Sequence, residues 1–426
     1  VALLSFVLGI WLWDHYFGKP EGYPPGTAEI ALVKIDRDLR LADAMSADPP
    51  WLKWLAAVEE PFIARENAMD VLKNLAVENA LNLQGLEAFA VIKATHENLP
   101  VREVLAEVMQ GQALTDFDYA SQLLSQHNGT WWQAKMVEAW ELNMRPAQHW
   151  RQTYGEDSQQ LRARAITVRG AVWLLGALGL IFIPKMVVRL RDGMRNRPKG
   201  YGASWGVTPG LTVFLVATLA WIGFTMTLEI GISILPGLHP AAGILLDSAA
   251  RMLPPLIALG LLFRRPSHAV RVMGLDQGVA VRTILGLFSL LMLVDQFLRF
   301  FLASDSASDP GGGLSAGEAG LWGLAFAIVS ACLLAPLAEE LLYRGVLFRT
   351  FWKRTGVLPA AVISSGVFAV LHFYDGYGLA SVAVFGLACA MLYAATGSLT
   401  SAICLHVLYN SSIKIPEWLI YHRPLG

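Results

Sequence analysis

Polar side chains stand in three apolar segments near the C-terminal end of the chain. The first segment, LLAPLAEELLYRGVLF at 333–348, carries Glu339, Glu340 and, four residues after the second glutamate, Arg344. A charge at bilayer depth costs at least about 3 kcal/mol on insertion scales, and such charges are usually functional. On an α-helix Glu340 neighbours Arg344 and Glu339 neighbours Tyr343, while the two glutamates point about 100° apart. We therefore expect Glu340 to pair with Arg344 and Glu339 to be left for chemistry.

The other two segments carry histidines. In FAVLH, His372 follows Phe368 by four residues, and in HVLYN, His406 precedes Asn410 by four, so each pair shares a helical face. Of the nine histidines, only these two fall inside the spans predicted below. One histidine in a membrane helix is as often a packing residue as a functional one. Two histidines, an asparagine and a carboxylate pair on the last spans indicate a site.

Hydrolysis of an amide bond is the chemistry that this set of residues favours. It needs a base that activates water, a group that orients the base or the water, and donors for the oxyanion that develops. No serine or cysteine has an evident histidine partner of the kind a nucleophilic protease uses. Cys404, two residues before His406, faces another side of the helix. The pattern therefore favours attack by water over a covalent intermediate.

Composition predicts the element type that must position these residues. With 54% hydrophobic residues, 16% charged residues and a mean hydropathy of +0.45, the chain is typical of a polytopic helical membrane protein. The net charge of −1 does not point to nucleic acid. The cysteines lack the spacing of a disulfide framework or a zinc finger. They are Cys332, Cys389 and Cys404.

We predict an all-α fold with about eight core transmembrane helices, an N-terminal anchor and a helical soluble domain. Residues 1–17 are interpreted as the anchor or the remainder of one, with a signal-peptide core as the alternative, since the apolar run is shorter than the ~20 residues of a full span. Residues 18–165, with charges of both signs and amphipathic periodicity, form the soluble domain, and 166–426 form the membrane core. The candidate spans are 168–188, 209–232, 241–263, 281–303, 319–338, 357–373, 378–396 and 399–413.

Basic loops predict the orientation of these spans. Lysines and arginines cluster after the first, third and fifth spans, which places those loops in the cytoplasm. They are Lys185, Arg189, Arg191, Arg195, Arg197, Lys199, Arg264, Arg265, Arg271, Arg349, Lys353 and Arg354. The soluble domain and the acidic, Gly-rich loop 304–320 then lie outside the cytoplasm. We expect RPSHAVRVMGLDQG, residues 265–278, to be an interfacial helix and turn.

Other features of the spans have structural interpretations. Asp247 with Arg251 and Asp295 with Arg299 are four apart, so we expect ion pairs on one helix face. Glu229 lies near the outer end of its span and can reach the interface. Pro336 removes a backbone donor toward the carbonyl of Cys332, so we expect the helix to break or kink there. Such a kink would open space for water beside Glu339.

The three motifs in this order resemble those of the CAAX-protease and bacteriocin-processing family (CPBP, also called Abi), related to the Ras-converting CAAX prenyl endopeptidase. EELLYRG, FAVLH and HVLYN carry the resemblance, which covers about 205–415 and leaves the soluble domain outside. It implies an eight-helix intramembrane endopeptidase that cuts peptide bonds with activated water. Carried over to this chain, Glu339 resembles the general base and His372 its helper in activating water. His406 and Asn410 resemble the oxyanion site, supported by Glu340 and Arg344, with Tyr343 and Phe368 as further motif residues.

Our expectations for the substrate class and the cofactor do not follow from the three motifs alone. The inserted domain 18–165 departs from the eukaryotic members and suggests a bacterial-type protein in the inner membrane. Its substrate would be a protein with a membrane-anchored or C-terminal sorting segment, met on the outer side together with membrane lipid. The domain could instead bind a protein partner or only pack on the core. We expect no cofactor; zinc held by Glu339, His372 and His406 is the alternative, although no HExxH motif is present.

Two non-proteolytic readings remain open. A membrane scaffold or immunity protein could keep such a site without using it, but all four catalytic positions are filled. A proton-coupled transporter would be expected to have internal repeats, and the spans have no convincing one.

Overall fold

A computed structural model describes residues 27–77, 81–108, 129–140, 145–196, 204–234, 240–302, 320–372 and 376–421. These residues form helices and no strand, so the predicted all-α class is confirmed for them. They divide into two compact units. The described residues of unit 1 lie within 172–415, and those of unit 2 lie within 27–171 and 416–421. The predicted domain limits at 18–165 and 166–426 stay predictions.

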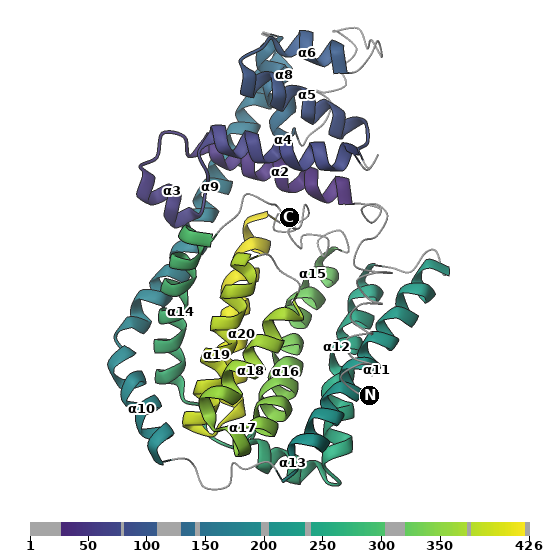
Figure 1. Ribbon diagram of the computed structural model, residues 1–426. Coiled ribbons are helices and arrows are strands. Elements are labelled where there is room, and N and C mark those ends of the chain that lie inside the picture. Colours follow the sequence, from purple (N-terminus) through teal and green to yellow (C-terminus); the bar gives the residue numbers. More distant parts are fainter. Residues whose placement is uncertain are drawn as a thin grey trace. The chain divides into compact units, whose positions relative to one another are not determined.

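Unit 2 contains the shorter helices of the N-terminal part of the chain (Figure 1). Helices form where the sequence supplies caps: Asn82 accepts the backbone N–H of Gly85 in front of α5, and Thr130 with Gln133 makes a capping box for α8. The helices are α2 (Thr27–Ala44), α3 (Pro50–Ala56), α4 (Pro61–Val77), α5 (Leu83–Glu97), α6 (Val101–Val108), α8 (Trp131–Ala139) and the first part of α9 (Arg145–Leu180).

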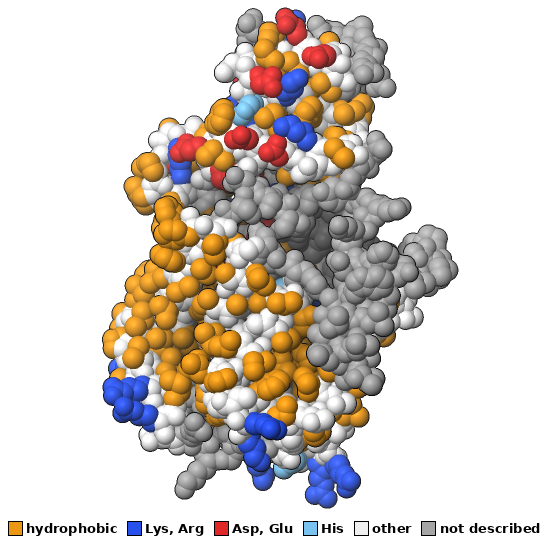
Figure 2. Space-filling view, viewed as in Figure 1, with side chains coloured by type: hydrophobic (Ala, Val, Ile, Leu, Met, Phe, Trp, Pro, Cys, Tyr) orange, Lys and Arg blue, Asp and Glu red, His pale blue; other side chains and the backbone are white. Residues whose placement is uncertain are grey.

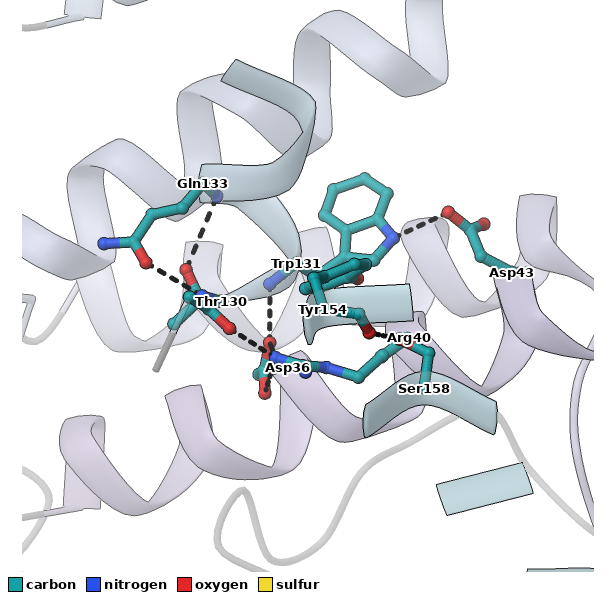
Figure 3. A network of polar contacts seen from close by, with 9 residues as sticks. Asp36, Arg40, Asp43, Thr130, Trp131, Gln133, Tyr154 and Ser158 are labelled. Carbon is teal, nitrogen blue, oxygen red and sulfur yellow. Dashed lines mark hydrogen bonds and ion pairs between the residues drawn. The ribbon is translucent and has the colours of Figure 1, made fainter. Parts of the chain in front are cut away.

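A buried polar network joins α2, α8 and α9 within unit 2 (Figure 3). Arg40 donates to both carboxylate oxygens of Asp36, at 3.1 and 3.2 Å, and its guanidinium lies 4.4 Å from the centre of the Tyr154 ring. Asp36 also accepts the backbone N–H of Trp131 at 2.6 Å. Because Trp131 is fully buried, this network ties the first turn of α8 to the core of the unit.

Unit 1 is a bundle of long apolar helices. Neighbours pack as α11 with α12, α10 with α14 and α19, and α18 with α19 (Figure 1). Their bounds are α10 (Ile183–Asn196), α11 (Val207–Ile234), α12 (Pro240–Leu262), α13 (Pro266–Met273), α14 (Val281–Leu302), α15 (Gly320–Val329), η2 (Ser330–Leu334), α16 (Ala335–Glu339), η3 (Glu340–Phe348), α17 (Arg349–Thr355), α18 (Val357–Val370), α19 (Gly376–Thr396) and α20 (Leu399–Tyr421).

Five of the described helices are long and apolar enough to cross a membrane, judged by length and composition. These segments are Ala147–Leu180, Val207–Leu228, Val281–Leu302, Trp322–Thr355 and Gly376–Thr396. Shorter apolar helices cover Ser248–Leu262 and Val357–Val370. The last predicted span, 399–413, lies in α20, which also contains Lys414 and Glu417 and is not among the five. Apolar side chains cover the visible face of unit 1, and Lys and Arg side chains gather at one end (Figure 2).

The helix that carries the two glutamates does not end at Pro336. It continues from Gly320 to Thr355, with π-helical segments η2 and η3 on either side of the short α16. In η2 the bonding shifts by one residue, so that the N–H of Ala335 donates to the carbonyl of Ser330. The wider π turn leaves room for the ring of Pro336, and its shifted hydrogen bonds allow the helix to continue although Pro336 has no backbone N–H to donate. Of the two predicted outcomes, a break or a kink, the break is wrong, because the helix continues through a π-helical bulge.

The predicted interfacial helix is α13, which Pro266 begins and Gly274, with a φ of 71°, ends. Arg349, fully buried on α17, donates to the carbonyl of Val272 and to the hydroxyl of Tyr393. These bonds attach α13 to α17, at the end of the helix that carries Glu339 and Glu340. Eight residues are too few to cross the hydrocarbon core, in agreement with the prediction.

The expected pair Asp295–Arg299 is wrong. Asp295 accepts hydrogen bonds from Tyr377 and Ser381 at 2.8 Å each, and lies 3.5 Å from the hydroxyl of Tyr409. The guanidinium of Arg299 lies over the Tyr377 ring instead. Hydroxyl groups from α19 and α20 thus satisfy this carboxylate. The anchor at 1–17, the loop 304–320 up to residue 319, and the side chains of Glu229 and Asp247 lie outside the described residues.

Candidate active site

Glu340 and Arg344 form an ion pair inside unit 1. Arg344 Nη1 lies 3.0 Å from Glu340 Oε1, and both side chains are 0% exposed. This is the separation of an ion pair, but the guanidinium N–H groups do not meet hydrogen-bond geometry with any described residue. The second oxygen of Glu340 also lacks a hydrogen-bond partner among the described residues. The pair therefore keeps hydrogen-bonding capacity that its immediate protein surroundings do not use.

His406 on α20 lies between the two glutamates. Its Nδ1 is 2.9 Å from Glu340 Oε1, and its Nε2 is 3.6 Å from Glu339 Oε2. A carboxylate only accepts hydrogen bonds, so Nδ1 carries a proton and Nε2 faces Glu339. Two acceptors facing each other repel unless one of them is protonated. Glu339 and His406 are thus arranged to share a proton.

Glu339 is the more accessible of the two carboxylates. Its side chain is 22% exposed, whereas that of Glu340 is fully buried. A base that activates water must be reachable by water, and a buried carboxylate with two partners is better suited to positioning. Their different exposure agrees with the separate roles expected for Glu339 and Glu340.

Phe368 on α18 joins the remaining side chains. Its ring lies 4.5 Å from the Arg344 guanidinium carbon, 4.5 Å from the His372 ring, 4.9 Å from the Tyr343 ring and 6.1 Å from the His406 ring. His372 Nδ1 is 2.6 Å from the backbone carbonyl of Phe368. Because that carbonyl only accepts, Nδ1 donates and the lone pair of a neutral ring lies on Nε2.

Asn410 connects α20 to the π-helical bulge. Its side-chain Nδ2 donates to the backbone carbonyl of Ala331 in η2 at 3.0 Å. An amide nitrogen has two N–H groups, so one remains for another acceptor. His406 and Asn410 lie one turn apart on α20, as expected, but His406 also contacts both glutamates. The prediction that His406 and Asn410 form the oxyanion site stays a prediction.

The sequence did not indicate that α19 contributes to the site. The Phe385 ring lies 4.6 Å from that of His406, and the buried thiol of Cys389 is close enough to Glu340 to interact with it. A methyl group built on Gly386 would lie 2.8 Å from Arg344 Nη2, so the absence of a side chain there admits the guanidinium. Phe385 and Cys389 share a face by their spacing of four, which is the one signal that could have drawn attention to them.

The described residues contain no group of three His, Cys, Asp or Glu side chains arranged as metal ligands. The zinc alternative with Glu339, His372 and His406 stays a prediction.

The part of the chain that contains the candidate site is similar to known proteins. The model of the family described as type II CAAX prenyl endopeptidase Rce1-like matches residues 321–412. A protein of Bacillus subtilis (strain 168), described as "Putative membrane peptidase YdiL", is 28% identical over 90 residues, which are 21% of this chain and 36% of that protein. The chain thus matches about a third of the relative's length. No solved structure matches the chain.

The segment 321–412 is thus similar to the family that the three motifs resemble. The matched segment contains Glu339, His372, His406 and Asn410, together with Glu340 and Arg344. With its long apolar helices and this similarity to membrane peptidases, the chain is an integral membrane protein.

Proposed function

We propose that the chain is an intramembrane endopeptidase in which Glu339 activates the water that cleaves a peptide bond. The observation that carries the proposal is the position of His406, 2.9 Å from Glu340 and 3.6 Å from Glu339, inside the segment that matches the CAAX prenyl endopeptidase family. This arrangement joins an accessible carboxylate to a histidine that a second, buried carboxylate orients.

In the first step Glu339 takes a proton from water, and the water oxygen bonds to the carbonyl carbon of the substrate. His372, whose tautomer is fixed by the Phe368 carbonyl, accepts a hydrogen bond from the same water through Nε2. The carbonyl oxygen becomes an oxyanion. Protonated His406 donates to it through Nε2, and the second N–H of Asn410 donates to it as well.

In the second step the proton held by Glu339 passes to the nitrogen of the leaving amine. The carbon–nitrogen bond breaks, and the oxyanion returns to a carbonyl as a carboxylic acid product forms. Glu340 and Arg344 touch no reacting atom; Glu340, paired with Arg344, accepts from Nδ1 of His406 and so orients its ring. The cycle ends with Glu339 ionised again, so no covalent enzyme intermediate is needed.

The test is cleavage by full-length protein purified in detergent, with Glu339→Gln as the variant. Glu339→Gln keeps the size of the side chain and removes the base, so we expect cleavage to fall by about 10²–10⁴-fold. The matched control is Glu66→Gln, at an exposed position on α4. Unchanged cleavage in Glu339→Gln would contradict the proposed base. A wild-type protein that cleaves nothing would instead favour the non-catalytic scaffold.

Substrates can be found by sequencing new protein C-termini in cells that produce wild-type protein or Glu339→Gln. We propose that they are proteins with a membrane-anchored or C-terminal sorting segment. Synthetic peptides with and without a prenyl group, added to the purified protein, then decide whether the lipid named in the family description is required.

The metal question has its own test. Activity that survives a chelator, in protein without stoichiometric zinc, supports metal-free hydrolysis. Loss of activity that zinc alone restores would support the zinc alternative with Glu339, His372 and His406.

We further propose that the protein lies in a bacterial inner membrane with residues 18–165 outside the cytoplasm. Exposed basic side chains at Lys185, Arg189, Arg264, Arg265, Lys353 and Arg354 support this orientation. The test is a cysteine-reactive reagent that does not cross membranes, applied to the variant Ala47→Cys, whose position is exposed between α2 and α3. The wild-type chain measures the background labelling of the native cysteines. Labelling of Ala47→Cys in intact cells supports the orientation, and labelling only after lysis contradicts it.

A further inference from the structure

Two large aromatic side chains are exposed on one face of the short helix α3. Trp51 is 65% exposed and Trp54 is 55% exposed. They are three residues apart, so they lie on the same side of the helix. The opposite side is buried through Lys53 and Ala56. Single exposed apolar residues are normal on protein surfaces, but two tryptophans on one short helix form a defined apolar face.

The orientation of this face is fixed from beneath. The buried ammonium group of Lys53 donates to both carboxylate oxygens of Glu60, at 3.0 and 2.9 Å, and to the carbonyl of Ser46 at 3.0 Å. Ala57, in the left-handed region at a φ of 48°, ends the helix, and the next residue, Val58, bonds back to the carbonyl of Lys53. The ion pair of Lys53 with Glu60 and the hydrogen bond at the end of α3 therefore fix the orientation of the helix that carries the two tryptophans.

The helix α3 and the residues just before it contact α9 at two positions, Arg162 and Gly170. Asp48, just before α3, accepts two hydrogen bonds of 2.6 Å from Arg162. Leu55 lies beside Gly170, where a methyl group would be 3.8 Å from its side chain. Gly170 directly follows Arg169, and no charged residue occurs between Arg169 and Lys185. The helix α3 thus lies next to the position where the sequence of α9 changes from charged to apolar.

That change marks the boundary between water and hydrocarbon along a spanning helix. Tryptophan concentrates at this boundary in membrane proteins, because its ring is apolar while its N–H can bond to headgroups or water. We propose that α3 is an interfacial anchor, whose Trp51 and Trp54 side chains insert into the headgroup region of the bilayer. The occupant of this face is lipid, and the inference does not depend on the proposed peptidase activity.

The test uses the full chain reconstituted in phosphatidylcholine and phosphatidylglycerol vesicles. One set of vesicles contains phosphatidylcholine brominated on the upper part of an acyl chain, a contact quencher of tryptophan. The emission lost in the variant Trp51→Phe/Trp54→Phe isolates the contribution of these two side chains. We expect brominated lipid to quench most of that contribution and aqueous iodide to quench little of it.

The matched control adds Leu99→Trp to the double phenylalanine variant. Leu99 is 44% exposed between α5 and α6, so a tryptophan there should be quenched by iodide and not by brominated lipid. The proposal is overturned if iodide quenches the α3 tryptophans, or if neither quencher reaches them, which would mean that protein covers them. Equal lipid quenching at position 99 would also overturn the assignment of the anchor to α3.

Discussion

The two units contain the same arrangement of three groups. In unit 2, Asp36 pairs with Arg40 four residues later, and the guanidinium lies 4.4 Å from the centre of the Tyr154 ring. In unit 1, Glu340 pairs with Arg344 four residues later, and the guanidinium lies 4.5 Å from the Phe368 ring.

The difference lies in the further partner of each carboxylate. Asp36 accepts the backbone N–H of Trp131, a group that does not titrate (Figure 3). Glu340 accepts from His406, whose other nitrogen faces Glu339. The same acid–arginine–aromatic arrangement therefore holds a helix end in one unit and orients a proton-sharing histidine in the other. An intrahelical ion pair alone does not identify a functional site; the group beyond it does.

The largest expected effect comes from removing each arginine. Arg344→Met leaves Glu340 without its counter-ion, and breaking a buried pair in this way costs about 3–5 kcal/mol. We expect Arg344→Met to lose cleavage altogether, whereas Arg40→Met lowers stability but leaves cleavage per folded molecule unchanged. Thermal unfolding in detergent and cleavage of the same substrate measure the two effects.

The double variant Glu340→Gln/Arg344→Met separates stability from function in this comparison. Removing both charges should restore much of the stability that Arg344→Met loses, and it should not restore cleavage. Equal losses of cleavage in Arg40→Met and Arg344→Met, per folded molecule, would remove the distinction between the two arrangements.

A smaller effect is expected from the aromatic rings. Phe368→Leu removes a desolvated cation–π contact worth about 2 kcal/mol, together with the ring that contacts both histidines. Because 1.4 kcal/mol corresponds to about tenfold in rate, cleavage should fall by tenfold or more. Tyr154→Leu, the matched change in unit 2, should lower only the unfolding temperature. A Phe368→Leu protein with normal turnover would show that the ring is mere packing.

Close packing around Arg344 provides a finer test. In Gly386→Ala the new methyl group would lie 2.8 Å from Arg344 Nη2, so the guanidinium must move at a cost of about 1–3 kcal/mol. We expect several-fold slower cleavage. The control is Gly366→Ala on α18, where a methyl group meets nothing within 4 Å. Similar kinetics in the two alanine variants would argue against close packing as a determinant of the site.

The smallest effect belongs to a third acid–arginine pair, Asp48 with Arg162. Hydrogen bonds from Arg162 hold the pKa of Asp48 below its ordinary value of 3.8. Because the folded pKa is the lower one, the stabilisation is fully present above the ordinary value and disappears as the pH falls through the folded one. Unfolding of wild type and Arg162→Met, followed between about pH 2 and pH 5, should differ at the upper end and converge at the lower end. A difference that persists at the acid end would contradict this source of stability.

Periodicity and composition predicted those features that depend on neighbours along the chain. The all-α class, the short helix α13 and the pair Glu340–Arg344 each depend on residues within a few positions of one another. The failure at Asp295 has the complementary cause. Its partners Tyr377, Ser381 and Tyr409 come from α19 and α20, and spacing within α14 carries no information about them.

The arrangement of the candidate site was predicted only in part. The motif residues Glu339, Phe368, His372 and His406 were found from their types, but the place of His406 between two glutamates depends on how α20 packs. The roles of Phe385, Gly386 and Cys389 depend on α19 in the same way. The π-helical segments could not be predicted either, because an apolar sequence has the same hydrophobic pattern in a π turn as in an α turn.

The segment η3 makes the length of the chain, and not only its residue types, a determinant of the site. A π turn holds one residue more than the α turn it replaces. Deleting a single residue between Glu340 and Arg344 would remove the extra residue of a π turn and shorten the separation of these two side chains from four residues to three. Arg344 would then turn relative to Glu340 and Phe368, although every motif residue remained in the sequence. Substitutions on the lipid side of this helix are therefore a milder kind of change than any insertion or deletion within it.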